Sequence, residues 1–223
     1  MKITWLGQAG LLFETDNITI MIDPYLSESC YKVNPNLNRN FPVDEKVFDI
    51  KPDVIILTHN HLDHTDPETL ERFIDGKKIT FLASGNAWQK VRTMGKGHNY
   101  VLFNNGTEFT VNGVTFKAVY AAHSDELSIG VVFTVEDKTY FVTGDTLYSN
   151  KIFESITDKI DVVFLPINGA GNNMNVVDAK RFCDKLNVKV AVPLHFGLHD
   201  KMTGEEFDYS GAVIPKPFKE III

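Results

Sequence analysis

Metal-binding side chains are unusually dense at one point of this sequence: His59, His61, Asp63 and His64 fall within a single short run. The run directly follows the apolar stretch Val54–Leu57, which has the composition of a buried strand. Imidazole nitrogens and a carboxylate at the end of a strand are suitable ligands for a borderline-soft divalent cation. The sequence therefore predicts a metal site at this strand end.

The spacing within the run suggests two ions rather than one. His59 and His61 are two residues apart, so in an extended or turn segment both can point to the same side and reach one ion. Asp63 and His64 are adjacent and turn away together, which suits a second ion nearby. The alternative is a set of ordinary polar loop residues, and it is disfavoured because further ligand types recur downstream.

Three later residues repeat the same pattern of a single polar ligand just beyond an apolar run. They are His123, Asp145 and His195, each with a small residue nearby. Any one of them alone is more simply explained as a buried histidine or a turn aspartate. Together with the first run they supply enough ligands for a two-metal site.

Hydrophobic periodicity predicts an α+β fold. Strands are expected at 3–6, 11–15, 18–22, 53–58, 79–83, 100–103, 108–111, 114–120, 129–135, 139–143, 162–165, 189–193 and 220–223. Helices are expected at 67–74, 86–94 and 151–156, and after the N-cap Asn175. Strands in antiparallel groups, with helices after each half, indicate two sheets face to face with helices outside.

Residues 23–50 lose this periodicity and are rich in Asn, Ser and Pro. A long loop is expected there, either a lid over a binding pocket or a mobile surface loop. Tyr25, Tyr31 and Phe41 are apolar enough to cover a pocket if the loop folds over one.

Length and composition narrow the function classes. The chain of 223 residues is long enough for one large domain spanning 1–223, and the net charge of −7 argues mildly against a nucleic-acid partner. Cys30 and Cys183 form no CxxC pattern, so neither a disulfide framework nor a thiolate metal site is expected. No signal peptide and no apolar run of about 18 residues is seen, so we expect a cytoplasmic protein with no membrane partner.

The ligand pattern resembles that of the metallo-β-lactamase-fold superfamily. Its His-x-His-x-Asp-His motif matches residues 59–64, and the later ligands match in order. The resemblance implies an αββα sandwich of two mixed sheets with helices on both outer faces. It also implies one metal held by His59, His61 and His123, a second held by Asp63, His64 and His195, and Asp145 bridging the two.

Residue identities distinguish branches of that superfamily. His61 stands where the diiron oxygen-reducing branch carries Glu, and Asp145 stands where antibiotic-hydrolysing enzymes carry Cys. The segments Trp5–Leu12 and Pro166–Asn175 resemble the branch that contains L-ascorbate-6-phosphate lactonase. The second segment departs from a phosphate-binding pattern, because no Lys or Arg lies between Leu165 and Lys180.

The expected chemistry is hydrolysis by a water that bridges two divalent ions, zinc first and manganese second, with iron compatible in some settings. Such ions lower the pKa of water from about 15.7 to roughly 7, which gives a hydroxide nucleophile at neutral pH. Asp63 and Asp145 are the candidate catalytic carboxylates, and Asp145 would hold both ions and orient the nucleophile.

Other polar residues could act at the site or could have a purely structural role. Asn168, Asn172 and Asn173 are candidate substrate contacts, although Asn also serves turn geometry before a helix, and Tyr148 is a further candidate donor. Asp23 either fixes the tautomer of a ligating histidine or is a plain turn aspartate. The remaining histidines, at 98 and 199, fit no ligand position and are interpreted as surface or structural residues.

The leading hypothesis is a metal-dependent hydrolase of a small ester, lactone or phosphoester, with a phosphorylated sugar lactone as one candidate substrate. The partner expected is a small-molecule substrate, and the sequence leaves open whether copies of the chain associate with one another. One alternative is a phosphodiesterase resembling ribonuclease Z, against which the acidic balance and the lack of a basic extension count. A second alternative is a non-catalytic metal-binding module, which the complete ligand set disfavours.

Overall fold

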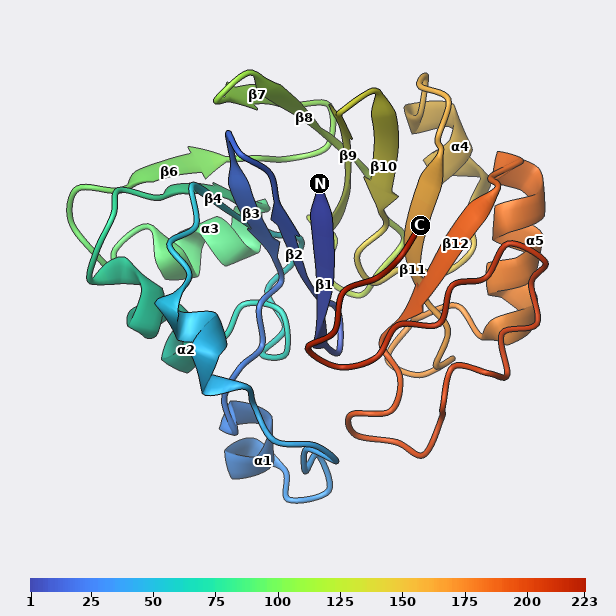
Figure 1. Cartoon of the computed structure of the whole chain (residues 1–223), viewed down its shortest axis with the longest axis horizontal. Coiled ribbons are helices and arrows are strands. Elements are labelled where there is room, and N and C mark those ends of the chain that lie inside the picture. Colours follow the sequence, from blue (N-terminus) through green and yellow to red (C-terminus); the bar gives the residue numbers. More distant parts are fainter.

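Short runs of β-branched and aromatic residues form two six-stranded sheets that pack face to face (Figure 1). The computed structural model describes residues 1–223. The first sheet contains, in spatial order, β1 (Lys2–Gly7), β2 (Gly10–Glu14), β3 (Thr19–Ile22), β4 (Val54–Leu57), β5 (Thr80–Ala83) and β6 (Asn99–Leu102). The second contains β12 (Val190–Leu194), β11 (Val162–Pro166), β10 (Lys138–Val142), β9 (Ile129–Val135), β8 (Val114–Tyr120) and β7 (Glu108–Val111).

Both sheets are mixed. In the first, β1, β2 and β3 pair antiparallel, and β3 to β6 pair parallel. In the second, β7 to β10 pair antiparallel, and β10, β11 and β12 pair parallel. As a result β1, β3 and β4 run in one direction, and β8, β10, β11 and β12 share a direction in their own sheet.

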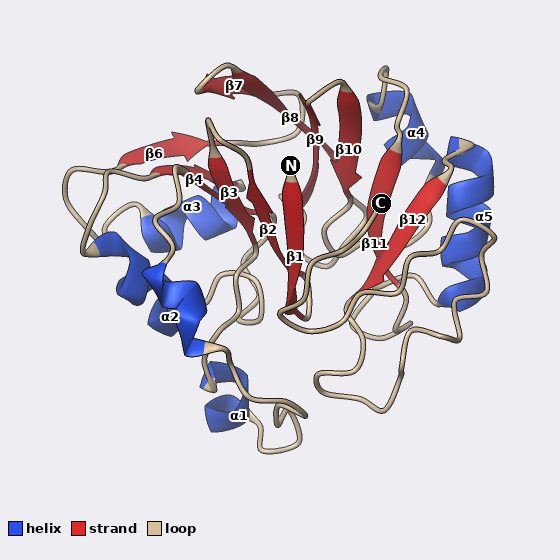
Figure 2. Ribbon diagram, in the orientation of Figure 1, coloured by secondary structure: helices blue, strands red, loops and turns tan.

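Helices cover the two outer faces (Figure 2). The first sheet carries α2 (Pro67–Ile74) and α3 (Gly85–Val91), and the second carries α4 (Asn150–Ser155) and α5 (Val176–Leu186). The predicted cap at Asn175 is present, because its side chain accepts from the Asp178 amide of α5, and Asp66 caps α2 in the same way by accepting from the Glu68 and Thr69 amides. The αββα sandwich expected from the sequence is confirmed. None of the helices combines the length and apolar character that a membrane-spanning segment requires.

Aromatic side chains fill the space between the sheets. Phe13 on β2 is fully buried and meets Phe133 edge-on, with ring centroids 5.1 Å apart. It also contacts Phe164 at 5.6 Å and Tyr140 at 5.9 Å, so it joins β2 of one sheet to β9, β10 and β11 of the other. Edge-to-face contacts of this kind add to the free energy gained from burial.

Two sequence expectations were wrong. Residues 23–50 are not structureless, because α1 (Ser29–Val33) and a 3₁₀ helix (Glu45–Asp49) form there. Phe48 of the 3₁₀ helix packs on Phe73 of α2, with ring centroids 5.2 Å apart, and this tertiary contact orders the segment.

The expected last strand at 220–223 is also absent, although its residues do pair. Only a single bridge joins Glu220 to Thr4 of β1. The Phe218 amide donates to the Trp5 carbonyl, and the Ile221 amide donates to the Ile3 carbonyl. The tail therefore lies along the outer edge of β1 without forming a regular strand, and its path beside β1 is visible in Figure 1.

We expect Phe13→Ala to lower the free energy of unfolding by about 3–5 kcal/mol, because it leaves a cavity between the sheets that their paired strands cannot close. Urea unfolding followed by circular dichroism measures this change. The control is Val177→Ala at a position that is 66% exposed, which should change the free energy of unfolding by less than about 0.5 kcal/mol. Equal effects of the two substitutions would contradict this account of the core.

Candidate metal centre

The candidate ligands lie just beyond the carboxyl ends of strands. His59 follows β4, His123 follows β8, Asp145 follows β10 and His195 follows β12. Because β8, β10 and β12 run in one direction, their ends reach the same edge of the second sheet, and the end of β4 meets them from the first sheet. Side chains that are far apart in the sequence therefore converge at one edge of the sandwich.

His59, His61 and His123 form the first group of potential ligands. One nitrogen from each lies within 4.8 Å of the others. The Nδ1 atom of His61 is 3.2 Å from Nε2 of His123, and His59 is completely buried behind them. This is the trio that the sequence resemblance assigned to one metal.

Asp63, His64 and His195 form the second group, again with ligand atoms within 4.8 Å of one another. Asp145 contacts the second group and is close enough to the first that its charge opposes the lowering of the pKa of His59 and His123 by burial. Its Oδ1 is 3.3 Å from Nε2 of His64, and its Oδ2 is 3.1 Å from Nε2 of His195. All of the ligand candidates named from the sequence therefore meet in one place.

Unpaired buried atoms show that these residues fit a metal. Nε2 of His59, Nε2 of His64 and Oδ1 of Asp145 are buried and have no hydrogen-bond partner. A buried polar atom left without a partner costs about 1–3 kcal/mol. A divalent cation among these atoms would accept their lone pairs and offset that cost, and an all-nitrogen and oxygen donor set suits zinc or manganese.

Asp23 orients His64 from behind. Its carboxylate is completely buried, and its Oδ2 accepts a hydrogen bond from Nδ1 of His64 at 2.7 Å. Its Oδ1 accepts from the Thr58 amide at 2.8 Å. When a metal takes the place of the proton on Nε2, this hydrogen bond would keep the remaining proton of His64 on Nδ1, which is the tautomer that a metal requires. Of the two readings of Asp23, the structure supports the tautomer-fixing one.

The histidines and aspartates of the centre shift one another's pKa values. Burial by itself lowers the pKa of His64 and of His195, but the carboxylates of Asp145 and Asp63 outweigh it, raising the pKa of His195 to about 10 and that of His64 well above its ordinary value. Burial raises the pKa of both aspartates, and the two histidines more than reverse this. The pKa of His59 is lowered by burial and by His64, so His59 is neutral and its lone pair is free.

Several further contacts hold the ligand loops in place. The Thr65 hydroxyl donates to the His59 carbonyl at 2.6 Å, and the buried Asp125 accepts from the Asn60 amide at 3.0 Å. Gly144 has a φ of +60°, and a Cβ there would lie 2.8 Å from the Ile129 carbonyl oxygen. No larger residue fits beside Asp145 without moving the backbone.

The candidate substrate residues have different surroundings. The amide of Asn168 lies 3.1 Å from Nδ1 of His195, and its side chain lines a pocket at the centre. Asn173 is buried, donates to Oδ2 of Asp145 at 2.9 Å and accepts from the Thr146 amide, so it positions Asp145.

The other two candidates do not line this pocket. The Asn172 side chain is exposed, and only its carbonyl, 3.3 Å from Nδ1 of His123, contacts the centre. Tyr148 packs against Phe153 and Phe182 of the helix layer instead.

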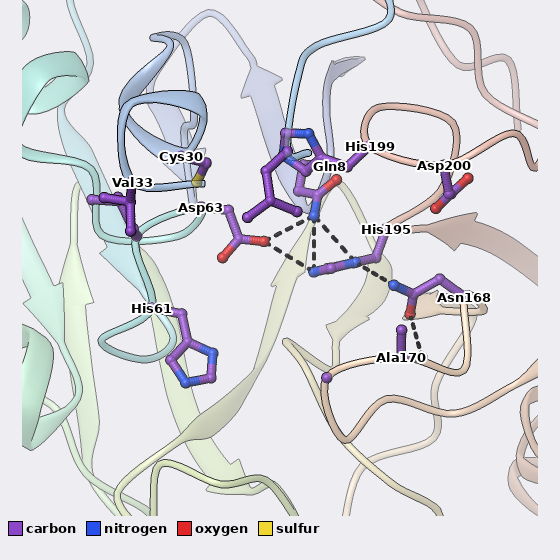
Figure 3. Close-up of a pocket in the computed structure, with 13 residues that line it drawn as sticks. Gln8, Cys30, Val33, His61, Asp63, Asn168, Ala170, His195, His199 and Asp200 are labelled. Atoms are coloured by element: carbon purple, nitrogen blue, oxygen red, sulfur yellow. Dashed lines mark hydrogen bonds and ion pairs between the residues drawn. The ribbon is translucent and has the colours of Figure 1, made fainter. Parts of the chain in front are cut away.

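A pocket of about 430 Å³ opens beside the centre, as Figure 3 shows. Its lining residues are Gln8, Cys30, Val33, Leu37, His61, Leu62, Asp63, Asn168, Ala170, Gly171, His195, His199 and Asp200. This volume is typical of small-molecule sites. The pocket borders both ligand groups, so a compound bound in it would lie against the candidate metal centre.

Gln8 is a site residue that sequence reasoning missed. Its Nε2 donates to Oδ2 of Asp63 at 2.8 Å and lies 3.2 Å from Nε2 of His195. The available signal was its position, since Gln8 follows β1 as the ligands follow their own strands, and it has a φ of +52°.

The two histidines outside the ligand set differ. His98 is structural, as expected, because its Nδ1 accepts from the Ile79 amide and its Nε2 contacts the Ile74 carbonyl at 3.1 Å. His199 lines the pocket, while its Nδ1 lies 3.2 Å from the Asn38 carbonyl. The interpretation of His199 as a surface or structural residue was therefore incomplete.

Comparison with known proteins supports a metal-dependent hydrolase of the beta-lactamase superfamily. The profile of the beta-lactamase superfamily domain matches residues 2–195. A UPF0173 metal-dependent hydrolase of Geobacillus thermodenitrificans is 32% identical over 213 residues, which covers 88% of this chain and 85% of the relative.

Two solved structures have a similar fold. The isothiocyanate hydrolase from Delia radicum gut bacteria superposes with a TM-score of 0.81 at 22% identity, covering 100% of this chain and 99% of that one. The metallo-beta-lactamase fold protein YhfI from Bacillus subtilis superposes with a TM-score of 0.72 at 20% identity, covering 99% of each chain.

We expect Asp23→Asn to weaken metal binding about 10–100-fold, because the amide no longer accepts strongly from His64 and offers a competing donor. Titration with zinc in the presence of a chelating indicator measures the affinity. The matched control is Asp16→Asn in an exposed turn, which should bind zinc like the unmodified chain. Equal zinc affinity in both variants would contradict the role given to Asp23.

Cys30 should be a slow nucleophile although it lines the pocket. Burial raises the pKa of its thiol to about 11, despite an opposing hydrogen bond with Tyr25. The reactive thiolate therefore stays scarce at neutral pH, and alkylation by iodoacetamide should accelerate steadily with pH through the alkaline range. Mass spectrometry of the labelled chain follows the rate, with Cys30→Ala to assign the site. A plateau at the ordinary thiol pKa of about 8.5 would contradict this expectation.

Proposed function

The chain belongs to the beta-lactamase superfamily, and we propose that it is a dinuclear metal-dependent hydrolase of a small ester, lactone or phosphoester. The observation that carries this proposal is the pair of ligand groups, with Asp145 against His64 and His195 and with buried ligand atoms that have no hydrogen-bond partner. His59, His61 and His123 would hold one ion, and Asp63, His64 and His195 the other. Zinc suits this donor set best, and manganese is the second choice.

The metal ions, when bound, would lower the pKa of water and polarise the carbonyl or phosphoryl group under attack. The chain's own residues set the geometry for this chemistry. Asp145 directs its two oxygens toward His64 and His195 of the second group, and its Oδ1, which has no hydrogen-bond partner, would be available to an ion. Asn173 holds Asp145 in that orientation through Oδ2.

The pocket determines how a substrate would approach. It borders His61 of the first group and both Asp63 and His195 of the second, so a scissile group placed there faces the two proposed metal sites at once. The amide of Asn168 lies on the same wall and is the best-placed side chain to contact a substrate oxygen. The likeness of Pro166–Asn175 to the ascorbate-phosphate lactonase branch supports a lactone as one candidate substrate.

The two alternatives are less well supported. A nuclease needs cationic side chains for the phosphate backbone, and none of the residues lining the pocket is Lys or Arg. A non-catalytic module has no need of a pocket that opens onto both ligand groups. The relative from Geobacillus thermodenitrificans, named a metal-dependent hydrolase, also supports hydrolysis.

We expect His61→Ala to lose bound metal and to reduce kcat/KM for an activated ester by more than about 100-fold. The reason is that losing a ligand should exceed the 10–100-fold cost of losing its outer partner. Metal content by plasma mass spectrometry and hydrolysis of 4-nitrophenyl acetate are the measurements. His98→Gln is the matched control, since His98 lies outside the centre and should leave both quantities unchanged.

Full metal content and activity in His61→Ala would overturn the ligand assignment. A purified chain that takes up zinc or manganese but hydrolyses no ester would favour the non-catalytic metal-binding module. Tight, salt-sensitive binding of tRNA would favour the nuclease.

A further inference from the structure

We propose that the part of the substrate that does not react is uncharged and apolar, and that it lies against α1 and Leu62. This inference rests on the proposed function and narrows its substrate class. It separates an ester or lactone with a hydrocarbon substituent from a phosphorylated sugar derivative.

The pocket has one polar and one apolar side. The polar side is the candidate metal centre, with Asp63, His195 and Asn168. The apolar side consists of Cys30, Val33, Leu37 and Leu62. In Figure 3, Cys30 and Val33 lie on one side of the pocket, while Asn168 and Ala170 lie on the opposite side.

Part of the apolar side is exposed to water, and this exposure does not stabilise the free protein. Val33 is 76% exposed at the end of α1, and Leu62, inside the ligand run, is only partly buried. A hydrocarbon chain seated against these side chains would remove apolar surface of both partners from water, which is favourable. The pocket volume of about 430 Å³ lies within the range of small-molecule sites, so a short chain or one ring fits.

No fixed cation faces this side of the pocket. Arg39 belongs to the same segment but does not line the pocket, because its Nη1 donates to the Tyr25 carbonyl at 3.0 Å and its guanidinium lies against the Tyr25 and Phe41 rings. His199 does line the pocket, and burial lowers the pKa of its imidazole, so it is neutral near pH 7.

Apart from the histidines of the metal centre, the charged side chains that line the pocket are acidic. Asp200 accepts from the Gly197 and Met202 amides at 2.8 Å, and Asp63 belongs to the second ligand group. A phosphate or carboxylate held away from the metal centre would therefore meet hydrocarbon on the side of α1 or Asp200 on the opposite side, with no Lys or Arg to pair with. This arrangement disfavours substrates that are anionic at their far end.

The test is a comparison of 4-nitrophenyl esters hydrolysed by the zinc-loaded full chain. In the series acetate, butanoate and hexanoate, each added methylene should raise kcat/KM about fourfold until the pocket is full. Heptanoate is then compared with the monoester of adipate, which replaces the far end of a similar chain with a carboxylate. We expect the neutral ester to be preferred by at least about tenfold.

A charge placed on the apolar side should reverse the preference. Val33→Lys introduces a cation at an exposed position, and it should raise kcat/KM for the adipate monoester relative to heptanoate about tenfold or more. Tyr31→Lys is the matched control, because Tyr31 is on the same helix and 45% exposed but does not line the pocket. It should change the ratio less than about twofold, and circular dichroism and zinc content verify that both variants are intact.

The outcomes separate the two proposals. Zinc-dependent hydrolysis without a chain-length effect, or with a preference for the adipate monoester, overturns this inference and leaves the proposed function standing. Equal effects of Val33→Lys and Tyr31→Lys also overturn it, since the charge would then act at a distance. Failure of the zinc-loaded chain to hydrolyse any ester contradicts the proposed function itself and removes the inference with it.

Discussion

The packing of Phe13 against rings of the opposite sheet is the contact on which the site depends. Because Phe13 contacts Phe133, Phe164 and Tyr140, it helps to set the relative position and the separation of the two sheets. The sheets in turn determine where their strands end, and the ligands lie directly after those ends. The interior of a protein is close-packed, so a shift of one sheet against the other would separate the histidines of the first sheet from the aspartate and histidines of the second.

The centre itself concentrates groups that would be unfavourable elsewhere in a core. His59, His64 and Asp145 are buried together with unpaired atoms, and Asp23 adds a further buried carboxylate. His195 and Asp23 also have φ values in the left-handed region, at +59° and +45°. Strain and unpaired polar atoms of this kind persist where the surrounding structure enforces them, and they are concentrated at functional sites. A bound cation would therefore be expected to stabilise the fold as well as serve the chemistry.

Much of the fold and of the ligand set could be predicted because both have local sequence signals. Strands were found from short β-branched runs, and the ligand run is contiguous at His59–His64. The rest depends on tertiary contacts that no local pattern reports. The helix at Ser29–Val33 is too short to show a period, and the different roles of Asn168 and Asn173 follow from which one the fold buries. Gln8 gave no signal by residue type, since a lone glutamine is common at a turn.

The C-terminal tail affects whether copies of the chain associate with one another. Strand β1 is the outermost strand of its sheet, and an unpaired strand edge is a template on which another chain can add. The amides of Phe218 and Ile221 occupy carbonyls of that edge. Proteolytic trimming of the tail would uncover these acceptors, and the shortened molecules would then tend to associate edge to edge.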